Sequence, residues 1–534
     1  MEARGFVLDD EALSSKKIVF RGCSTVDPSR PLVVKYPNEY PSLPPNVYSD
    51  TRGNYLPRHH NRSSGEICTF GPRRSRWDAR KYGVDAVNEA EDVIRQFSAA
   101  SLPVPGDDAP EPITAELDYN QECSLLIPNE IANGIRGAGV WTKGTVGIFL
   151  KEEKILKDAG ILRGVIVQVS VDEKVVNAPD YYKKWPVGSS CSAKGTLVML
   201  PGPPVVPKNP RDFFDWLGKF GGTKPKSWAI FAYQDQTIER SRTQLQFFGV
   251  YIPSASEHKI VKIYQMIDED RTSRVPNLGG LSDKKVMILG CGSLGSKIAV
   301  NLAATGVKQF CLIDAEHMDP GNAVRHEVGV GSFGLPKGYA LLNRVNDMNP
   351  GTRAGSGWIK RILGDPNVHI MFDSELQNII GKMDLVVEAT GVYGIGRYVN
   401  ILCFDLGIPA LFVGLTNGAW AGEVVRAIPG KTACWMCWVN QYYDHRPPAE
   451  PEPPQGVFAP GCNQPTFTGT TYEVGMVANL ASWFAVETLL RDVSGRQDFQ
   501  GDYIRWTGRG GAGTPIIKTE VLPVAKRKDC SWCG

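Results

Sequence analysis

The chain has 534 residues, of which 42% are hydrophobic and 22% are charged, and its formal net charge is +2. This composition is ordinary for a globular protein, the length predicts two to four domains, and the small net charge gives no reason to expect nucleic acid or a membrane surface as a partner. Residues 1–17 lack the apolar core of a signal peptide, and no stretch approaches a membrane span, so we expect a cytoplasmic protein. In that compartment its 12 cysteines are better explained as core residues, metal ligands or nucleophiles than as disulfides.

Residues 1–100 combine strand-like stretches with a helical pattern at 84–97. A Tyr-Pro pair and a Pro-Pro-x-Val stretch lie within 36–47, and Gly-x-Ile-Cys follows at 65–68, before Trp77. The order and spacing of these short motifs resemble the core of a ubiquitin-conjugating enzyme. The resemblance implies an α+β fold for this domain.

The same resemblance implies that Cys68 accepts an acyl group as a thioester and that Asn61 stabilises the oxyanion when an amine attacks. One position departs from the family's His-Pro-Asn tripeptide, because His60 stands where the proline is expected. An acid or base role for His59 or His60 is open, and a surface histidine is the simpler interpretation of each. The alternative for the whole domain is a noncatalytic conjugating-like fold that only binds a partner.

The acidic, proline-rich run at 102–113 predicts a linker, since it suits neither a helix nor a central strand. Residues 114–275 mix probable strands with shorter helical stretches and carry no chemical motif. We therefore expect an α/β linker domain over this range. Its strands are predicted at 164–171, 195–202, 227–233 and 246–252.

Residues 280–534 alternate apolar strands with helical stretches, the pattern of a Rossmann-like, parallel α/β sheet. The first strand runs into Gly290-Cys-Gly292-Ser-Leu-Gly295 and then a helical stretch. Such glycines allow a tight turn, the approach of backbone to phosphate, and close helix packing. Asp314 ends the next strand, where a carboxylate can bind ribose. These features predict a nucleotide site, and a nicotinamide dehydrogenase is the first alternative.

Three residues that follow Asp314 in the chain favour a triphosphate ligand over a dinucleotide. Arg325 and Lys337 can neutralise phosphate charge, and the amide of Asn322 can hold an oxygen. Together with the glycine loop and Asp314, they resemble the ThiF-like adenylation domain of ubiquitin-activating enzymes and of bacterial enzymes that adenylate sulfur-carrier proteins. The resemblance implies ATP and Mg²⁺ as cofactors. It also implies attack on the α-phosphate by a C-terminal glycine carboxylate, with Asp314 on the ribose and Arg325 acting in catalysis.

One departure concerns magnesium. The family usually has an aspartate directly after the strand and its threonine, and here that position is Gly391. Asp384 and Glu388 are the acidic residues nearby, and either is a candidate for taking part in magnesium binding. The structural alternative for Asp384 is a turn residue at the start of the strand.

Two Cys-x-x-Cys pairs predict a four-thiolate zinc site without a catalytic position, although a redox pair is an alternative. The four cysteines are Cys434, Cys437, Cys530 and Cys533. The adenylating relatives carry a zinc site of this layout.

Cys462 follows a second proline-rich run, at 445–460, in a setting typical of an exposed loop. It resembles the cysteine of activating enzymes that takes the acyl group from the adenylate, and the alternative is an incidental loop thiol.

The combined resemblance is to fused activating and conjugating enzymes of bacterial anti-phage operons, including CBASS systems and bacterial ubiquitination-like operons. It implies a homodimer, a target protein, and transfer from adenylate to Cys462, to Cys68 and to an amine. The activated partner is then a ubiquitin-like modifier, or a protein such as a cyclic-nucleotide synthase with a C-terminal glycine. Two rivals are a sulfur-carrier adenylyltransferase with an accessory N-terminal domain and a noncatalytic binding scaffold.

Overall fold

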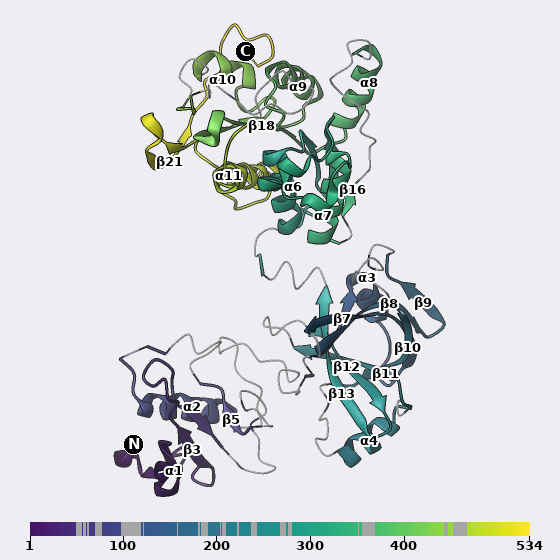
Figure 1. Ribbon diagram of the computed structural model, residues 1–534, viewed down its shortest axis with the longest axis vertical. Coiled ribbons are helices and arrows are strands. Elements are labelled where there is room, and N and C mark those ends of the chain that lie inside the picture. Colours follow the sequence, from purple (N-terminus) through teal and green to yellow (C-terminus); the bar gives the residue numbers. More distant parts are fainter. Residues whose placement is uncertain are drawn as a thin grey trace. The chain divides into compact units, whose positions relative to one another are not determined.

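The structure is a computed structural model in which the chain divides into two compact units, residues 1–267 and 268–534, each described separately below (Figure 1). No helix among the described residues is both long and apolar enough to span a membrane. The described residues are 1–49, 56, 60, 64–69, 77–78, 80–97, 119–120, 122–156, 159–179, 182, 191–202, 204, 210–221, 224–236, 243–266, 274–275, 280–350, 352–354, 369–442, 447–451 and 467–533.

The first part of the N-terminal unit is an antiparallel sheet whose strands follow chain order, packed against a 15-residue helix. Valine and isoleucine side chains of the strands meet a row of alanines and aliphatics at helical spacing, which gives this part its own core. The elements are β1 (Val7–Leu8), α1 (Asp10–Ser14), β2 (Val19–Cys23), β3 (Pro31–Lys35), β4 (Asn46–Tyr48), β5 (Glu66–Ile67) and α2 (Gly83–Phe97).

The second part of this unit is richer in strands than the α/β domain expected from the sequence. Its sheet closes on itself, because β6 pairs in parallel with both β13 and β8 and so completes a ring of seven strands. Two helices accompany the sheet among the described residues. The elements are β6 (Cys123–Pro128), α3 (Asn129–Ile135), β7 (Lys143–Leu156), β8 (Ala159–Val171), β9 (Lys174–Asn177), β10 (Cys191–Leu200), α4 (Pro210–Gly218), β11 (Ser227–Gln236), β12 (Thr243–Ser254) and β13 (Glu257–Met266).

The C-terminal unit contains an eight-stranded sheet in the order β16-β15-β14-β17-β18-β19-β20-β21. The first five strands in this order, from β16 to β18, are parallel, as the sequence predicts. The last three, β19, β20 and β21, extend the sheet in antiparallel fashion, which was not predicted from the sequence. The strands are β14 (Lys285–Leu289), β15 (Gln309–Ile313), β16 (Arg353–Ala354), β17 (Leu385–Glu388), β18 (Ala410–Leu415), β19 (Ala421–Ala427), β20 (Tyr503–Arg509) and β21 (Pro515–Leu522).

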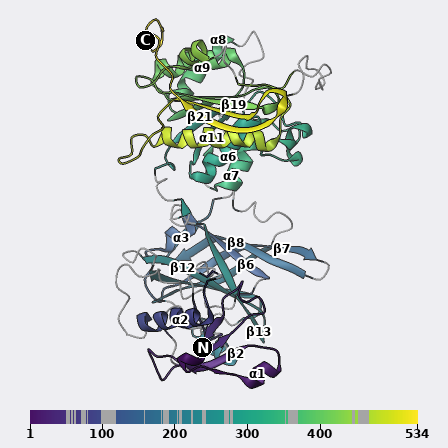
Figure 2. The same cartoon turned by 90° about the vertical axis from the view of Figure 1, so that its left-hand side faces the viewer.

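Helices cover both faces of this sheet (Figure 2). Alternate strand side chains point to opposite faces, so Leu385 and Val387 pack against one helical layer and Val386 against the other. The first layer contains α6 (Ser293–Thr305), α7 (Lys337–Met348) and α11 (Thr471–Leu489), and the second contains α8 (His369–Ile380), α9 (Tyr393–Leu406) and α10 (Trp435–Tyr442). Strand order reverses between β14 and β17, and ligands of such sheets bind at the carboxyl ends of the strands at this point.

Candidate functional site

The glycine loop after β14 has the geometry expected of a phosphate-binding turn. Gly290 has φ +90°, and an added Cβ would lie 2.7 Å from the backbone of Ala389, so this position requires glycine. At Gly295 an added Cβ would lie 1.9 Å from the Gly290 carbonyl oxygen. Gly292, the N-cap of α6, instead faces open space, with nothing within 4 Å of an added Cβ. The loop is therefore tightly packed at both ends and open at its centre, where a phosphate can approach the helix N-terminus.

Replacing Gly295 by alanine is expected to displace the loop, since the new methyl group would meet backbone that cannot rotate away. We expect ATP affinity to fall by at least about tenfold, the loss of roughly one good hydrogen bond to a charged group. Binding of a fluorescent ATP analogue measures this. Gly331→Ala is the control, because that position has no neighbour within 4 Å and no positive φ. Equal affinity in both variants would contradict the assignment of the loop.

His326 holds this loop in place, a role that no motif in the sequence indicates. Its Nε2 donates to the Cys291 carbonyl oxygen at 2.7 Å, and its Nδ1 accepts from the Val328 N–H at 3.0 Å. Burial lowers the pKa of His326, which favours the neutral ring that these two bonds require. The bond to Cys291 fixes the 320–328 segment against the glycine loop. The only sign of this role in the sequence is the position of a histidine directly after Arg325.

Arg325 is consequently held next to the loop. Its guanidinium is half-buried, and burial lowers its pKa. The guanidinium carbon lies 5.4 Å from the centre of the Phe467 ring, and within the described chain no carboxylate forms an ion pair with it. A partly desolvated cation without a carboxylate partner is suited to an anionic ligand. Asn322 lies in the preceding 3₁₀ turn (Pro320–Val324), where its side-chain amide bonds to no other described residue.

Asp314 lies at the carboxyl end of β15, beside the loop. Its carboxylate accepts from the Cys291 N–H at 2.7 Å and from the Glu316 N–H at 2.8 Å. Burial raises the pKa of Asp314, and these two bonds and the Lys337 charge oppose the increase. Lys337, the first residue of α7, is 6% exposed and ion-paired to Glu316. The structure thus brings Asp314 and Lys337 to the same side of the glycine loop, but Lys337 must exchange its carboxylate partner to contact a phosphate.

The two acidic magnesium candidates lie at opposite ends of β17. Asp384 precedes the strand, accepts from the Lys285 N–H at 2.8 Å and lies 3.8 Å from the Lys284 ammonium. It therefore lies at the amino ends of β14 and β17, away from the glycine loop, and the structure does not bring it to the site. Glu388 ends the strand on the loop side.

Glu388 is 5% exposed, and one carboxylate oxygen, Oε1, accepts from both the N–H and the hydroxyl of Thr390. Burial raises the pKa of Glu388 to about 7, although the Thr390 bonds oppose the increase. A buried carboxyl group beside a nucleotide loop is a functional-site candidate. Gly391, which follows, has φ +71° and carries no ligand side chain.

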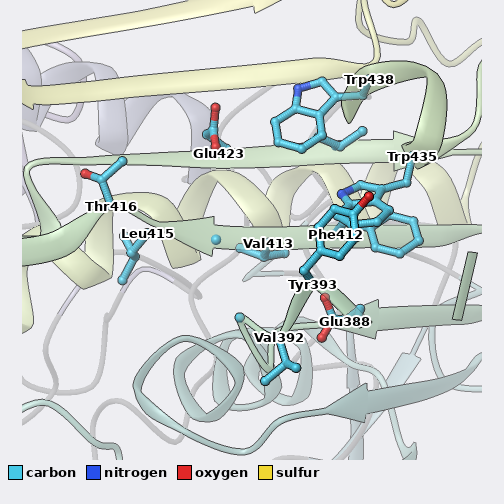
Figure 3. A pocket seen from close by; sticks show the side chains of 13 residues that line it. Glu388, Val392, Tyr393, Phe412, Val413, Leu415, Thr416, Glu423, Trp435 and Trp438 are labelled. Carbon is cyan, nitrogen blue, oxygen red and sulfur yellow. The ribbon is translucent and has the colours of Figure 1, made fainter. Parts of the chain in front are cut away.

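Glu388 lines a cavity of about 260 Å³ on the sheet face covered by α9 and α10 (Figure 3). Aromatic rings form one wall, and Trp435 lies 5.3 Å from both Phe412 and Tyr393, measured between ring centres. This cavity is not evident in the sequence, because its lining comes from β17, β18, β19, α9 and α10. The thirteen lining residues are Glu388, Gly391, Val392, Tyr393, Phe412, Val413, Gly414, Leu415, Thr416, Glu423, Val425, Trp435 and Trp438.

Cys462 lies in 452–466, outside the described residues, but both flanks of that stretch are described. The Thr468 hydroxyl donates to the Glu450 carboxylate at 2.7 Å, which joins the two flanks. The Thr416 hydroxyl donates to the Pro448 carbonyl oxygen at 2.9 Å, which fixes the first flank beside the cavity. The second flank begins at Phe467, next to Arg325. Cys462 therefore belongs to a segment whose two ends are anchored near the glycine loop and the cavity.

The two Cys-x-x-Cys pairs meet. Their sulfur atoms all lie within 4.8 Å of one another, with Cys434 3.5 Å from Cys530 and Cys437 3.5 Å from Cys533. Four sulfurs around one zinc ion at about 2.3 Å would be about 3.8 Å apart, so the donor set and its spacing fit zinc. The Arg527 N–H donates to the Cys437 sulfur at 3.4 Å, which suits a thiolate. The cluster joins α10 to residues 523–533 beyond β21.

In the N-terminal unit, Cys68 follows β5 and is half-buried, whereas Asn61 and His59 lie outside the described residues. The interpretation of His60 as a surface histidine is wrong, since its exposed fraction is 1%. Its Nδ1 accepts from the Leu56 N–H at 3.1 Å, and its Nε2 lies 3.1 Å from the Ser49 carbonyl oxygen. His60 also forms a β-bridge with Ile67, the residue before Cys68. It therefore has a structural role in positioning the chain at Cys68.

His60→Ala is expected to loosen this region, since it leaves the Leu56 N–H and the Ser49 carbonyl without their buried partner. We expect the local free energy of opening to fall by about 1–3 kcal/mol. Hydrogen exchange of the amides at 46–49 and 64–69 measures the loss. Alanine at exposed Lys17 is the control, and unchanged exchange in His60→Ala would contradict the structural role.

Residues 270–519 match the sequence model described as the ThiF family. This stretch is a ThiF-family domain. The glycine loop, Asp314, Arg325, Lys337, the cavity and the first cysteine pair all lie within it.

Sequence relatives extend the comparison. The chain is 31% identical over 282 residues to uncharacterized protein y4oA of Sinorhizobium fredii, covering 52% of this chain and 47% of that protein. It is 31% identical over 144 residues to ATP-dependent ubiquitin transferase-like protein Cap2 of Enterobacter hormaechei, covering 27% of this chain and 22% of Cap2. It is 23% identical over 214 residues to ubiquitin-like modifier-activating enzyme 5 of Oryza sativa, covering 38% of this chain and 50% of that enzyme. The chain spans about half or less of the length of these relatives.

Among solved structures, the chain is similar to E. coli MccB, crystallised with AMPCPP and MccA. The TM-score is 0.37 and the identity is 19%, over 50% of this chain and 75% of MccB.

Proposed function

We propose that the ThiF-family domain uses ATP to adenylate the C-terminal carboxylate of a protein or peptide. The proposal is carried by the hydrogen bond from His326 to Cys291, which holds Arg325 beside a glycine loop that is open at Gly292. A phosphate at the N-terminus of α6 would meet backbone N–H groups and the guanidinium together. The substrate carboxylate attacks the α-phosphorus, pyrophosphate leaves, and an acyl-adenylate forms.

We further propose that Cys462 and Cys68 carry the acyl group in turn. The Cys462 thiolate attacks the acyl-adenylate and displaces AMP, and the Cys68 thiolate then attacks this thioester and releases Cys462. An amine of a target protein displaces Cys68 and forms an amide, with Asn61 stabilising the oxyanion. Support comes from the anchoring of both flanks of the Cys462 segment near the glycine loop and from the position of Cys68 after β5.

Two metals complete the proposal. Zinc, held by Cys434, Cys437, Cys530 and Cys533, has a structural role, because four thiolates leave no open position. Magnesium accompanies the phosphates of ATP, where it supplies positive charge. Gly391 supplies no ligand side chain to that ion.

The experiment is mass spectrometry of the intact chain after incubation with ATP, Mg²⁺ and peptides that end in Gly-Gly. We expect thioester adducts on wild type, an adduct on Cys462 alone in Cys68→Ala, and none in Cys462→Ala. Cys23→Ala is the control, since Cys23 is exposed and has no proposed role. An adduct on Cys68 in the Cys462→Ala variant would contradict the order of transfer. Pyrophosphate exchange without any adduct would confine the function to adenylation.

A further inference from the structure

The cavity beside Glu388 has the charge of a site for a cation. Its lining includes two carboxylates, Glu388 and Glu423, and none of the thirteen described lining residues is Lys, Arg or His. Glu423 lies in β19, where it accepts from the Tyr503 hydroxyl at 2.6 Å and has Arg505 of β20 as its cross-strand partner. The cationic Arg505 offsets the charge of Glu423, so the charge of the cavity that lacks a nearby cation is that of Glu388. A negative, largely apolar cavity is electrostatically complementary to a positive group.

Glu388 is the residue that requires such a partner. Its Oε1 is satisfied by Thr390, whereas Oε2 has no hydrogen-bond or ion-pair partner among the described residues. The exposed fraction of Glu388 is only 5%, and Figure 3 shows its side chain beside the rings of Tyr393 and Phe412. Burying a carboxylate without a cation is unfavourable, and burial accordingly raises its pKa to about 7.

The aromatic wall adds a second attraction. Phe412 and Trp435 are stacked, with ring centres 5.3 Å apart and an angle of 24° between their planes, and Trp438 continues the series 6.2 Å from Trp435. Ring faces attract cations, most strongly where water is excluded. Carboxylate and aromatic faces together therefore favour a guanidinium or an ammonium on an apolar stem.

Size and position identify the source of this cation. About 260 Å³ is smaller than the roughly 300–1,000 Å³ of pockets for drug-sized ligands, which suits one long side chain. The lining segment 388–393 contacts the glycine loop, because Ala389 and Thr390 lie against Gly290. A peptide whose carboxylate lies at the loop would reach the cavity within a few residues, at about 3.3 Å per residue.

We propose that this cavity receives an arginine or lysine side chain from the segment just before the C-terminus of the activated protein or peptide. The inference rests on the proposed adenylation and gives it a substrate class: chains with a basic residue a few positions before a C-terminal glycine. Glu388 acts as a specificity residue, and Trp435 and Phe412 contact the stem of the bound side chain.

The test uses the full chain and labelled hexapeptides that end in Gly-Gly and carry arginine, its uncharged isostere citrulline, or glutamate at the third, fourth or fifth position from the C-terminus. At one of these positions we expect the arginine peptide to bind at least about tenfold more tightly than the citrulline peptide, as measured by fluorescence anisotropy. Glu388→Gln should reduce this ratio to about twofold or less, since it keeps the shape and removes the charge. Asp384→Asn is the matched control, because it removes a carboxylate from the other end of β17 and should keep the ratio.

Pyrophosphate exchange with the same peptides separates this inference from the proposed function. The inference would be overturned, and adenylation left standing, by one result with the wild-type protein: the arginine and citrulline peptides support equal rates of pyrophosphate exchange and bind with equal affinity. Arginine preference that depends on Glu388 without any exchange would support the cavity and contradict adenylation. A preference that persists in Glu388→Gln, or no arginine-peptide binding at about 1 mM, would overturn the inference. A Glu388→Gln variant that loses ATP binding and keeps the arginine preference would also overturn the inference. Glu388 would then act in nucleotide binding and not in recognition of the peptide.

Discussion

Arg325→Ala is expected to lower the rate of ATP–pyrophosphate exchange by about 10²-fold, equivalent to about 3 kcal/mol of transition-state stabilisation. The reason is that Arg325 directly precedes His326, whose bond to Cys291 fixes this segment against the glycine loop. The Arg325 guanidinium is also half-buried and pairs with no described carboxylate. Negative charge that develops on the phosphates during displacement would meet this cation in a partly dehydrated site. Exchange of radiolabelled pyrophosphate into ATP measures the effect.

Two further variants test whether the effect belongs to this position. Arg325→Lys should recover part of the rate, because it restores the charge without the forked geometry of the guanidinium. Lys431→Ala should leave the rate unchanged, because that ammonium is 62% exposed and pairs with Asp492 on the surface. A normal exchange rate in Arg325→Ala, with the protein folded, would remove Arg325 from the catalytic machinery.

Loss of the four-cysteine site is expected to have the largest effect on stability. In Cys437→Ser, one of four sulfur ligands is gone, and we expect zinc to be released and the C-terminal unit to lose several kcal/mol, since structural zinc contributes directly to folding free energy. The C-terminal segment 523–533 should lose its protection first, because the cluster joins it to α10. Elemental analysis of zinc and hydrogen exchange over 523–533 measure the two effects.

Cys23→Ser is the control for this prediction, because Cys23 is an exposed thiol in the other unit. Chelation of the wild-type protein should reproduce the Cys437→Ser result without a mutation. A wild-type protein that contains no zinc, or a Cys437→Ser protein with unchanged protection over 523–533, would contradict the structural role.

Local features of the site were predictable from the sequence. The glycine loop, the strand that ends at Asp314 and each of the two Cys-x-x-Cys pairs are encoded by residues close together in the chain, and the structure brings the two pairs to one site. Apolar runs likewise located β14, β15 and β17, since buried parallel strands are short apolar runs.

Features that depend on distant partners were not predictable in this way. The antiparallel extension pairs β19 with β20, which begins 76 residues after β19 ends, counting from Ala427 to Tyr503. The cavity lining combines β17, β18 and β19 with α9 and α10, so no stretch of sequence shows its aromatic wall. His60 was interpreted as a surface histidine and His326 was given no role, because a histidine has the same appearance in a sequence whether it is exposed or buried with both ring nitrogens bonded. Burial and hydrogen bonding, which define their roles, are properties of the fold.

The closed sheet of the N-terminal unit has a consequence for the order in which the protein folds. The strand at 123–128 pairs with the strand at 257–266, so the ring cannot close until more than 130 residues after its first strand have been made. Contacts between residues so far apart in sequence form slowly, because the entropy of closing the loop must be lost first. During synthesis on the ribosome, the edge of β6 that pairs with β13 stays unpaired until residue 266 has emerged, whereas its other edge can pair with β8 much earlier. The nascent chain is then most exposed to aggregation, and a chaperone that binds unpaired strands would act during this interval.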